Sequence, residues 1–132
     1  MKILIMYLCF VCVLLFQSCA PDEIEILEPQ DVDQIPHFPG GVQEMYKFIY
    51  DNLRYPKEAR EMGISGSVKT MFYVDRSGLL MDIHAISGPG YGLNEEAVRV
   101  VELMNIGHRW IPGTLNGETV RVSFILPIKF VL

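Results

Sequence analysis

The chain has 132 residues, half of them hydrophobic, and its 11 basic and 16 acidic side chains give a formal net charge of −5. This length suits one domain behind an N-terminal segment. The negative charge argues against a nucleic-acid-binding protein, which needs a basic face, and against electrostatic attraction to anionic lipid headgroups.

The first segment of the chain predicts export. One positive charge, Lys2, precedes an almost wholly apolar run of about 14 residues that ends at Phe16. Such a run makes a helix of roughly 21 Å, short of the ~20 residues that span a bilayer, and is typical of the core of a secretory signal. The run leads into "LFQSC", residues 15–19, which resembles the lipobox of bacterial lipoproteins. The resemblance implies cleavage after Ser18 and lipid attachment at Cys19.

The alternative is an uncleaved N-terminal anchor, and both interpretations place the rest of the chain outside the cytoplasm. All cysteines of the chain, Cys9, Cys12 and Cys19, lie in or beside this segment. The domain that follows therefore has no free thiol, which excludes thiol catalysis, disulfides and redox chemistry there.

Residues 20–35 (APDEIEILEPQDVDQI) are rich in carboxylates and contain two prolines and no basic residue. This composition favours an extended, solvated tether, whose sixteen residues reach at most ~55 Å. The sequence thus divides into a lipoprotein signal peptide over residues 1–18, an acidic tether over 19–35 and a folded domain over 36–132.

Two helices are expected at the start of the domain. Apolar residues recur at helical spacing from Gly41 to Leu53, which predicts an amphipathic helix that Tyr55-Pro56 ends. A second, short helix is expected over Lys57–Met62, with Gly63 as its left-handed cap.

A β-hairpin and a third helix follow. The segment Ser67–Val74 is rich in β-branched and aromatic residues and predicts a strand, and Leu79–Ser87 is its return strand after a turn at Asp75-Arg76-Ser77-Gly78. A glycine-rich loop then leads to a helix over Leu93–Met104. Its expected cap and acidic first turn are Asn94, Glu95 and Glu96, and its expected buried stripe is Ala97, Val98, Val101 and Met104.

The last predicted elements are a turn at Asn116-Gly117 and a final strand over Glu118–Val131, which Pro127 interrupts in character. The order of elements is α-α-β-β-α-β. It predicts an α+β fold, a small three-stranded antiparallel sheet with helices packed on one face.

Six blocks, in this order, resemble the C-terminal domain of TonB-type energy transducers: "PHFPGG" (36–41), "YPKEAREMGISGSV" (55–68), "FYVDRSG" (72–78), "LNEEAVRVV" (93–101), "WIPGTLNGETVRV" (110–122) and "LPIKF" (126–130). The resemblance covers Pro36 to Leu132. The motif residues that carry it are Pro39, Gly40, Gly41, Tyr55, Pro56, Gly66, Asp75, Gly78, Trp110, Pro112, Gly113, Asn116, Gly117 and Pro127.

The resemblance implies a function in the cell envelope. TonB-type proteins carry proton-motive energy from an inner-membrane motor to outer-membrane receptors, and their terminal domain grips an extended receptor peptide by adding it as a strand to a sheet edge. It implies a periplasmic, lipid-anchored protein whose partner is an outer-membrane receptor. The alternative is a lipid-anchored module that holds another envelope protein without energy coupling, because the apolar segment is short and the tether limited.

The binding edge can be located from Pro127. A proline has no N–H and belongs on the edge of a sheet, and the peptide groups of a strand point alternately to either side. Arg121, Ser123 and Ile125 would then face outward, and we expect a partner peptide to bond there and to stop before Pro127. The alternatives are an unpaired edge, or one covered by the N-terminal segment or by a second copy, as a homodimer.

No motif indicates an enzyme. The glycines of "SGPGYGLNEE" are followed by Glu95 and Glu96 where a phosphate would need positive potential, so this segment is expected to be a turn. The three histidines are too far apart in sequence to predict a metal site. Trp110 is expected to be a core or hairpin anchor. We therefore expect no catalytic residue, metal or cofactor.

Overall fold

The computed structural model describes residues 23–132. The predicted signal peptide, the predicted lipid attachment site Cys19 and the first residues of the predicted tether lie outside the described residues. The elements are, in chain order, η2 (Pro29–Asp31), α2 (Val42–Asn52), α3 (Lys57–Glu61), β1 (Gly66–Val74), β2 (Leu80–Ser87), α4 (Leu93–Leu103), β3 (Gly113–Leu115), β4 (Glu118–Val120) and β5 (Val122–Phe130). None of the helices in this range is long and apolar enough to cross a membrane.

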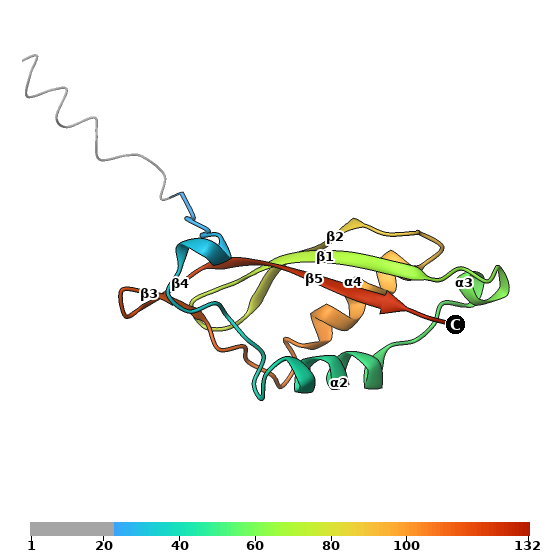
Figure 1. The fold of residues 1–132 in the computed structure, drawn as a ribbon, viewed down its shortest axis with the longest axis horizontal. Coiled ribbons are helices and arrows are strands. Elements are labelled where there is room, and N and C mark those ends of the chain that lie inside the picture. The colour runs from blue at the N-terminus through green and yellow to red at the C-terminus, as the bar shows by residue number, and fades with distance from the viewer. Residues whose placement is uncertain (1–22) are drawn as a thin grey trace, which may run out of the picture.

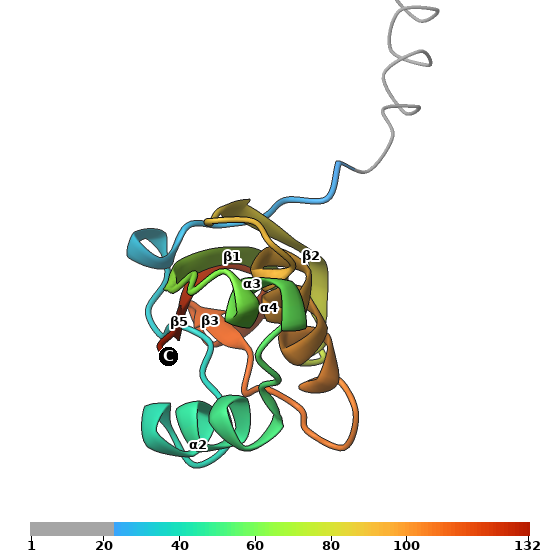
Figure 2. The same cartoon turned by 90° about the vertical axis from the view of Figure 1, so that its right-hand side faces the viewer.

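The predicted α+β fold is confirmed. The main sheet has three antiparallel strands in the order β2-β1-β5, so β2 and β5 are its edges. Helices α2 and α4 lie on one side of the sheet, and the N-terminal segment crosses on the other side (Figures 1 and 2). We call that second side the open face.

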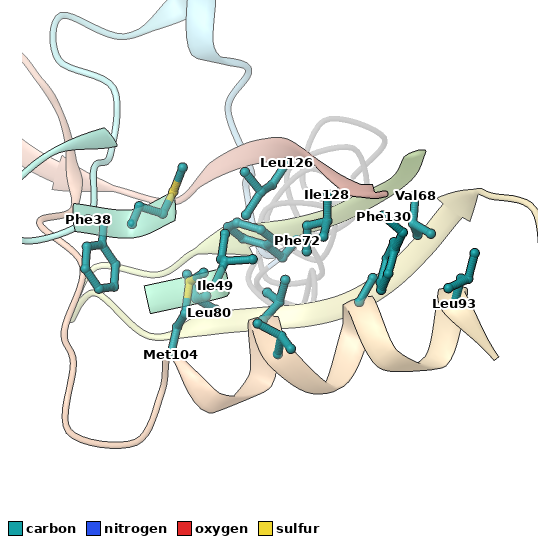
Figure 3. Close-up of a cluster of buried hydrophobic side chains, with 14 of the residues drawn as sticks. Phe38, Ile49, Val68, Phe72, Leu80, Leu93, Met104, Leu126, Ile128 and Phe130 are labelled. Carbon is teal, nitrogen blue, oxygen red and sulfur yellow. The ribbon is translucent and has the colours of Figure 1, made fainter. Parts of the chain in front are cut away.

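The core fills the space between the sheet and the helices. Figure 3 shows Phe72, Leu126, Ile128 and Phe130 of the sheet pointing toward α4, together with Ile49 of α2. Trp110 is 2% exposed, and its ring packs edge-on against Phe72 and Phe124. The tryptophan is therefore a core anchor, as predicted.

The final strand differs from the prediction. The continuous strand expected over Glu118–Val131 is divided at Arg121: β4 pairs with β3 in a separate two-stranded hairpin, and β5 pairs with β1. Pro127 does not interrupt β5. Its nitrogen faces away from β1, so the missing N–H removes no hydrogen bond from the sheet.

Helix α4 is capped differently and turned slightly from the expected orientation. Its N-cap is Gly92 in the left-handed conformation, and the Asn94 side chain instead accepts a hydrogen bond from the Gly90 N–H at 3.1 Å. The buried positions of α4 include Leu93 and Val100, whereas Val98 is only half-buried. The predicted stripe was therefore wrong at Val98.

Part of the predicted tether belongs to the fold. We call residues 23–35 the N-terminal arm. Gln34 pairs with Thr114, and Leu27 pairs in parallel with Val122 of β5. The segment attached to the domain therefore begins at Leu27, earlier than the predicted boundary at Pro36.

Candidate functional site

The outer edge of β5 is the candidate site, and one end of it is occupied by the chain itself. The Leu27 N–H donates to the Arg121 C=O at 2.9 Å, and the Ser123 N–H donates to the Leu27 C=O at 2.9 Å. Arg121 and Ser123 thus present their backbone groups away from β1, in the orientation that Pro127 predicts.

The same alternation assigns the remaining residues of the strand. The Thr70 hydroxyl of β1 donates to the Leu126 C=O at 2.8 Å, so Leu126 faces the sheet. Ile125, between Ser123 and Pro127, must face outward. Within residues 23–132, no backbone group outside the sheet bonds to Ile125, and its side chain is 51% exposed. The three predicted residues therefore share one edge, of which Ile125 is the open part.

Two residues at this edge were not predicted from the sequence. Leu27 supplies the backbone contacts, and the Ser123 hydroxyl donates to Glu28 Oε2 at 3.0 Å. A signal was present in the alternating "EIEI" of residues 23–26, a pattern typical of a strand. The acidic composition of the whole segment favoured a tether instead.

A hollow of about 230 Å³ lies beside the edge, between the arm and the open face. Ile26 and Glu28 line it from the arm, and Met71, Tyr73 and His84 are among the residues that line it from the sheet. It therefore combines apolar walls with the carboxylates of Glu28 and Asp82 and the hydroxyl of Ser123.

The motif residues Pro39, Gly40 and Gly41 form the turn into α2. Gly40 and Gly41 have φ angles of 91° and 92°, and the Gly41 N–H donates to the Phe38 C=O at 2.9 Å. The turn buries Phe38, whose ring lies 5.9 Å from that of Phe48 on the helix.

Tyr55, Pro56 and Gly66 surround the short helix α3. The Tyr55 hydroxyl donates to the Ile64 C=O, and its ring packs edge-on against Phe130. Pro56 is the N-cap of α3, and Gly66 begins β1. These contacts hold α3 beside the C-terminal end of β5.

Asp75 and Gly78 form the turn between β1 and β2. The Asp75 carboxylate accepts hydrogen bonds from the Ser77 N–H and hydroxyl and from the Leu79 N–H. Partial burial raises the pKa of Asp75, but these hydrogen bonds outweigh it and hold the pKa below its usual value. Gly78 lies against the backbone of Trp110, whose N–H donates to the Gly78 C=O at 3.1 Å.

Pro112, Gly113, Asn116 and Gly117 belong to the segment that carries β3 and leads toward β5. A Cβ on Gly113 would lie 2.6 Å from Val122 Cγ2, so this glycine permits a close approach of the hairpin to β5. Asn116 and Gly117 both have positive φ, which is typical of a two-residue hairpin turn. The Asn116 N–H donates to Asp33 Oδ2 at 2.8 Å, which attaches the arm to the hairpin.

An ion pair within α4, between Glu96 and Arg99, bonds to the backbone at the end of α2. Arg99 Nη2 donates to Glu96 Oε1 at 2.6 Å and to the Asn52 C=O at 2.8 Å, and the Arg54 N–H donates to Glu96 Oε1. Burial raises the pKa of Glu96, but the hydrogen bonds from Arg99 and the Arg54 N–H, together with the charge of Arg99, outweigh this effect and hold the pKa below its usual value. These groups have structural partners and lie away from the edge.

Comparisons with known proteins cover most of the domain. The family model for the Gram-negative bacterial TonB protein C-terminal matches residues 51–132. The chain is also similar to an NMR structure of the C-terminal domain of Helicobacter pylori TonB (its residues 194–285), with 25% identity, a TM-score of 0.50 and coverage of 67% of this chain and 90% of that one. A longer fragment of the same domain (its residues 179–285) gives 25% identity, a TM-score of 0.51 and coverage of 71% and 86%. Comparison with curated proteins gives no match.

Proposed function

Because the chain belongs to the family of Gram-negative TonB C-terminal domains, a family of protein-interaction domains in the cell envelope, we propose that it binds extended peptide segments of outer-membrane receptors as an added strand on β5. Main-chain hydrogen bonds supply the affinity in this mode of recognition, and side-chain contacts supply the specificity.

The observation that supports this proposal is the pairing of Leu27 with Arg121 and Ser123. An extended segment, from far away in sequence, already lies in hydrogen-bonding register on this edge. The next outward residue, Ile125, offers its backbone to a further strand in the same register.

Crosslinking in intact cells tests the proposal. A photoreactive residue at Ile125 is expected to capture a TonB-dependent outer-membrane receptor. The matched control is Ile86 on β2, which is 45% exposed on the opposite edge strand, against 51% for Ile125. Equal capture of the receptor from both positions, or capture of a second copy of this chain from Ile125, would contradict the proposed use of β5.

The same experiment separates the two functions that the sequence leaves open. If a receptor is captured, and if its capture is lost when the proton-motive force is abolished, the result supports a role in TonB-dependent transport. Capture of a different, identified envelope protein supports the alternative of an interaction module without energy coupling.

We also propose that Cys19 carries a lipid that holds the domain at a membrane surface, facing the periplasm. The support is the "LFQSC" pattern after an apolar run of signal-peptide length. Fatty-acid labelling of the wild-type chain that is lost in Cys19→Ala is the expected result. Undiminished labelling in that variant would refute the lipid site.

A further inference from the structure

We infer that residues 24–29 of the arm are an intramolecular competitor for the partner peptide, so that a partner must displace Leu27 to use the whole β5 edge. This inference rests on the proposed function, because it concerns the regulation of the same edge. In Figure 1 the arm (blue) reaches β5 (red) near the start of that strand.

The first step of the argument is the identity of the groups involved. The Arg121 C=O and the Ser123 N–H point outward and are the groups that a new strand would use at this end of β5. Leu27 occupies both of them. Each group is positioned for one strand on this edge, so the arm and a partner cannot both pair there.

The second step is that the arm covers only one end of the edge. In a parallel pair, the next donor toward the Ser123 C=O would be the N–H of residue 29, two residues after Leu27. That residue is Pro29, which has no N–H, and the chain turns away there into η2. The arm therefore leaves Ile125 open, where a partner strand can begin to pair.

The third step is that the arm is weakly held. No residue of the arm is buried, and the Ile24 and Ile26 side chains are 60% and 40% exposed. The arm is attached again at Asp33 and Gln34, which bond to the β3–β4 hairpin. Residues 24–29 can consequently leave the edge while the base of the arm stays in place.

The fourth step indicates which peptide would fit. Ile26 and Glu28 lie two positions apart, and both line the hollow on the open face. The Glu28 carboxylate also accepts a hydrogen bond from the Ser123 hydroxyl. A partner that replaces them needs an apolar side chain followed two positions later by a carboxylate. The partner chemistry is therefore an extended peptide with an apolar-x-acidic pattern, and the arm segment "ILE" (26–28) is its internal counterpart.

The test measures the affinity of the full-length chain, in detergent, for a fluorescent synthetic peptide that copies residues 24–32 (IEILEPQDV). Leu27→Pro removes the N–H that bonds to Arg121, and we expect it to tighten binding about tenfold by opening the edge. Glu28→Ala removes only the Ser123 contact, and about a threefold gain is expected. Ile24→Pro is the matched control, because it places a proline in the arm at a position without a backbone bond to β5.

Equal affinities for the wild type, Leu27→Pro and Ile24→Pro would overturn the inference, as would the absence of peptide binding to the Leu27→Pro chain. Unchanged thermal unfolding of both proline variants verifies that the domain is intact. Crosslinking from Ile125 separates this inference from the proposed function. Receptor capture that is the same in the wild type and in Leu27→Pro contradicts the competitor alone, whereas no receptor capture in either chain contradicts the function.

Discussion

Gly78 connects the turn of the β1–β2 hairpin to Trp110, and Gly78→Ala should destabilise the domain strongly. Gly78 has a φ of 88°, and a Cβ there would lie 2.0 Å from the carbonyl oxygen of Trp110. That oxygen belongs to the backbone, so no side-chain rotation can relieve the contact.

Three effects add in this variant. The left-handed conformation costs an alanine about 1–2 kcal/mol, of which about 0.4–1 kcal/mol is offset by the lower entropy of the unfolded chain. The steric conflict adds about 1–3 kcal/mol, and loss of the Trp110–Gly78 hydrogen bond adds about 0.5–1.5 kcal/mol. We therefore expect a loss of about 1.5–6 kcal/mol, centred on about 4 kcal/mol, which is a large part of the 5–15 kcal/mol typical of a domain.

Gly117→Ala is the matched control for the backbone effect. Gly117 also lies in a hairpin turn, its φ is 79°, and a Cβ there would meet nothing within 4 Å. Its expected loss is only about 1 kcal/mol. For a domain of about 100 residues, the Tm should fall by more than about 12 °C for Gly78→Ala and by about 4–8 °C for Gly117→Ala.

Urea unfolding measures both losses of unfolding free energy. It can be followed by circular dichroism and by the fluorescence of Trp110, which is the single tryptophan of the chain. Equal losses of unfolding free energy in the two variants would refute the steric argument, because the two glycines share the positive φ and differ in the contact with Trp110.

Three further predictions concern the core, the ion pair and the edge. Phe72→Ala removes a buried ring between Trp110 and Phe124 and should cost about 3–5 kcal/mol in urea unfolding, and a loss below about 1 kcal/mol would contradict the core packing. The folded protein holds the pKa of Glu96 below its usual value of 4.5, so the stability that its charge contributes is present above pH 4.5 and is lost as the pH falls through the folded pKa. Glu96→Gln should therefore flatten the pH dependence of the unfolding free energy below about pH 5, and an unchanged slope would contradict this. Pro127→Ala adds an N–H that points away from β1, so it should change the unfolding free energy by less than about 1 kcal/mol. Leu126→Ala removes a buried side chain and should cost about 2–5 kcal/mol. Similar losses in the two variants would contradict the edge assignment.

The sequence predicts those parts of the fold that depend on local patterns. The helix over Val42–Asn52 and both strands of the hairpin follow from apolar spacing and turn residues. The orientation of β5 follows from one residue, because Pro127 can lie only with its nitrogen at the edge. The backbone contacts of Arg121 and Ser123 agree with that orientation.

The remaining features depend on contacts between distant segments. Glu28 and Ser123 are 95 positions apart, and no local pattern encodes their pairing. The three-residue strand β3 is too short for a periodicity and exists through its pairing with β4. Helix α4 has Gly92 as its N-cap, although Asn94 is a residue type that caps helices more often, so the local sequence alone does not fix where this helix begins.

The central claim is that β5 binds a partner strand. Site-resolved amide exchange with a synthetic peptide that copies an extended segment of a TonB-dependent receptor tests this claim most directly. We expect new protection at the Ile125 N–H, whereas the protection of the Val122, Phe124 and Leu126 N–H groups, which face β1, should not change. Protection gained only at those three inward groups, or no change at Ile125 under saturating peptide, would contradict it.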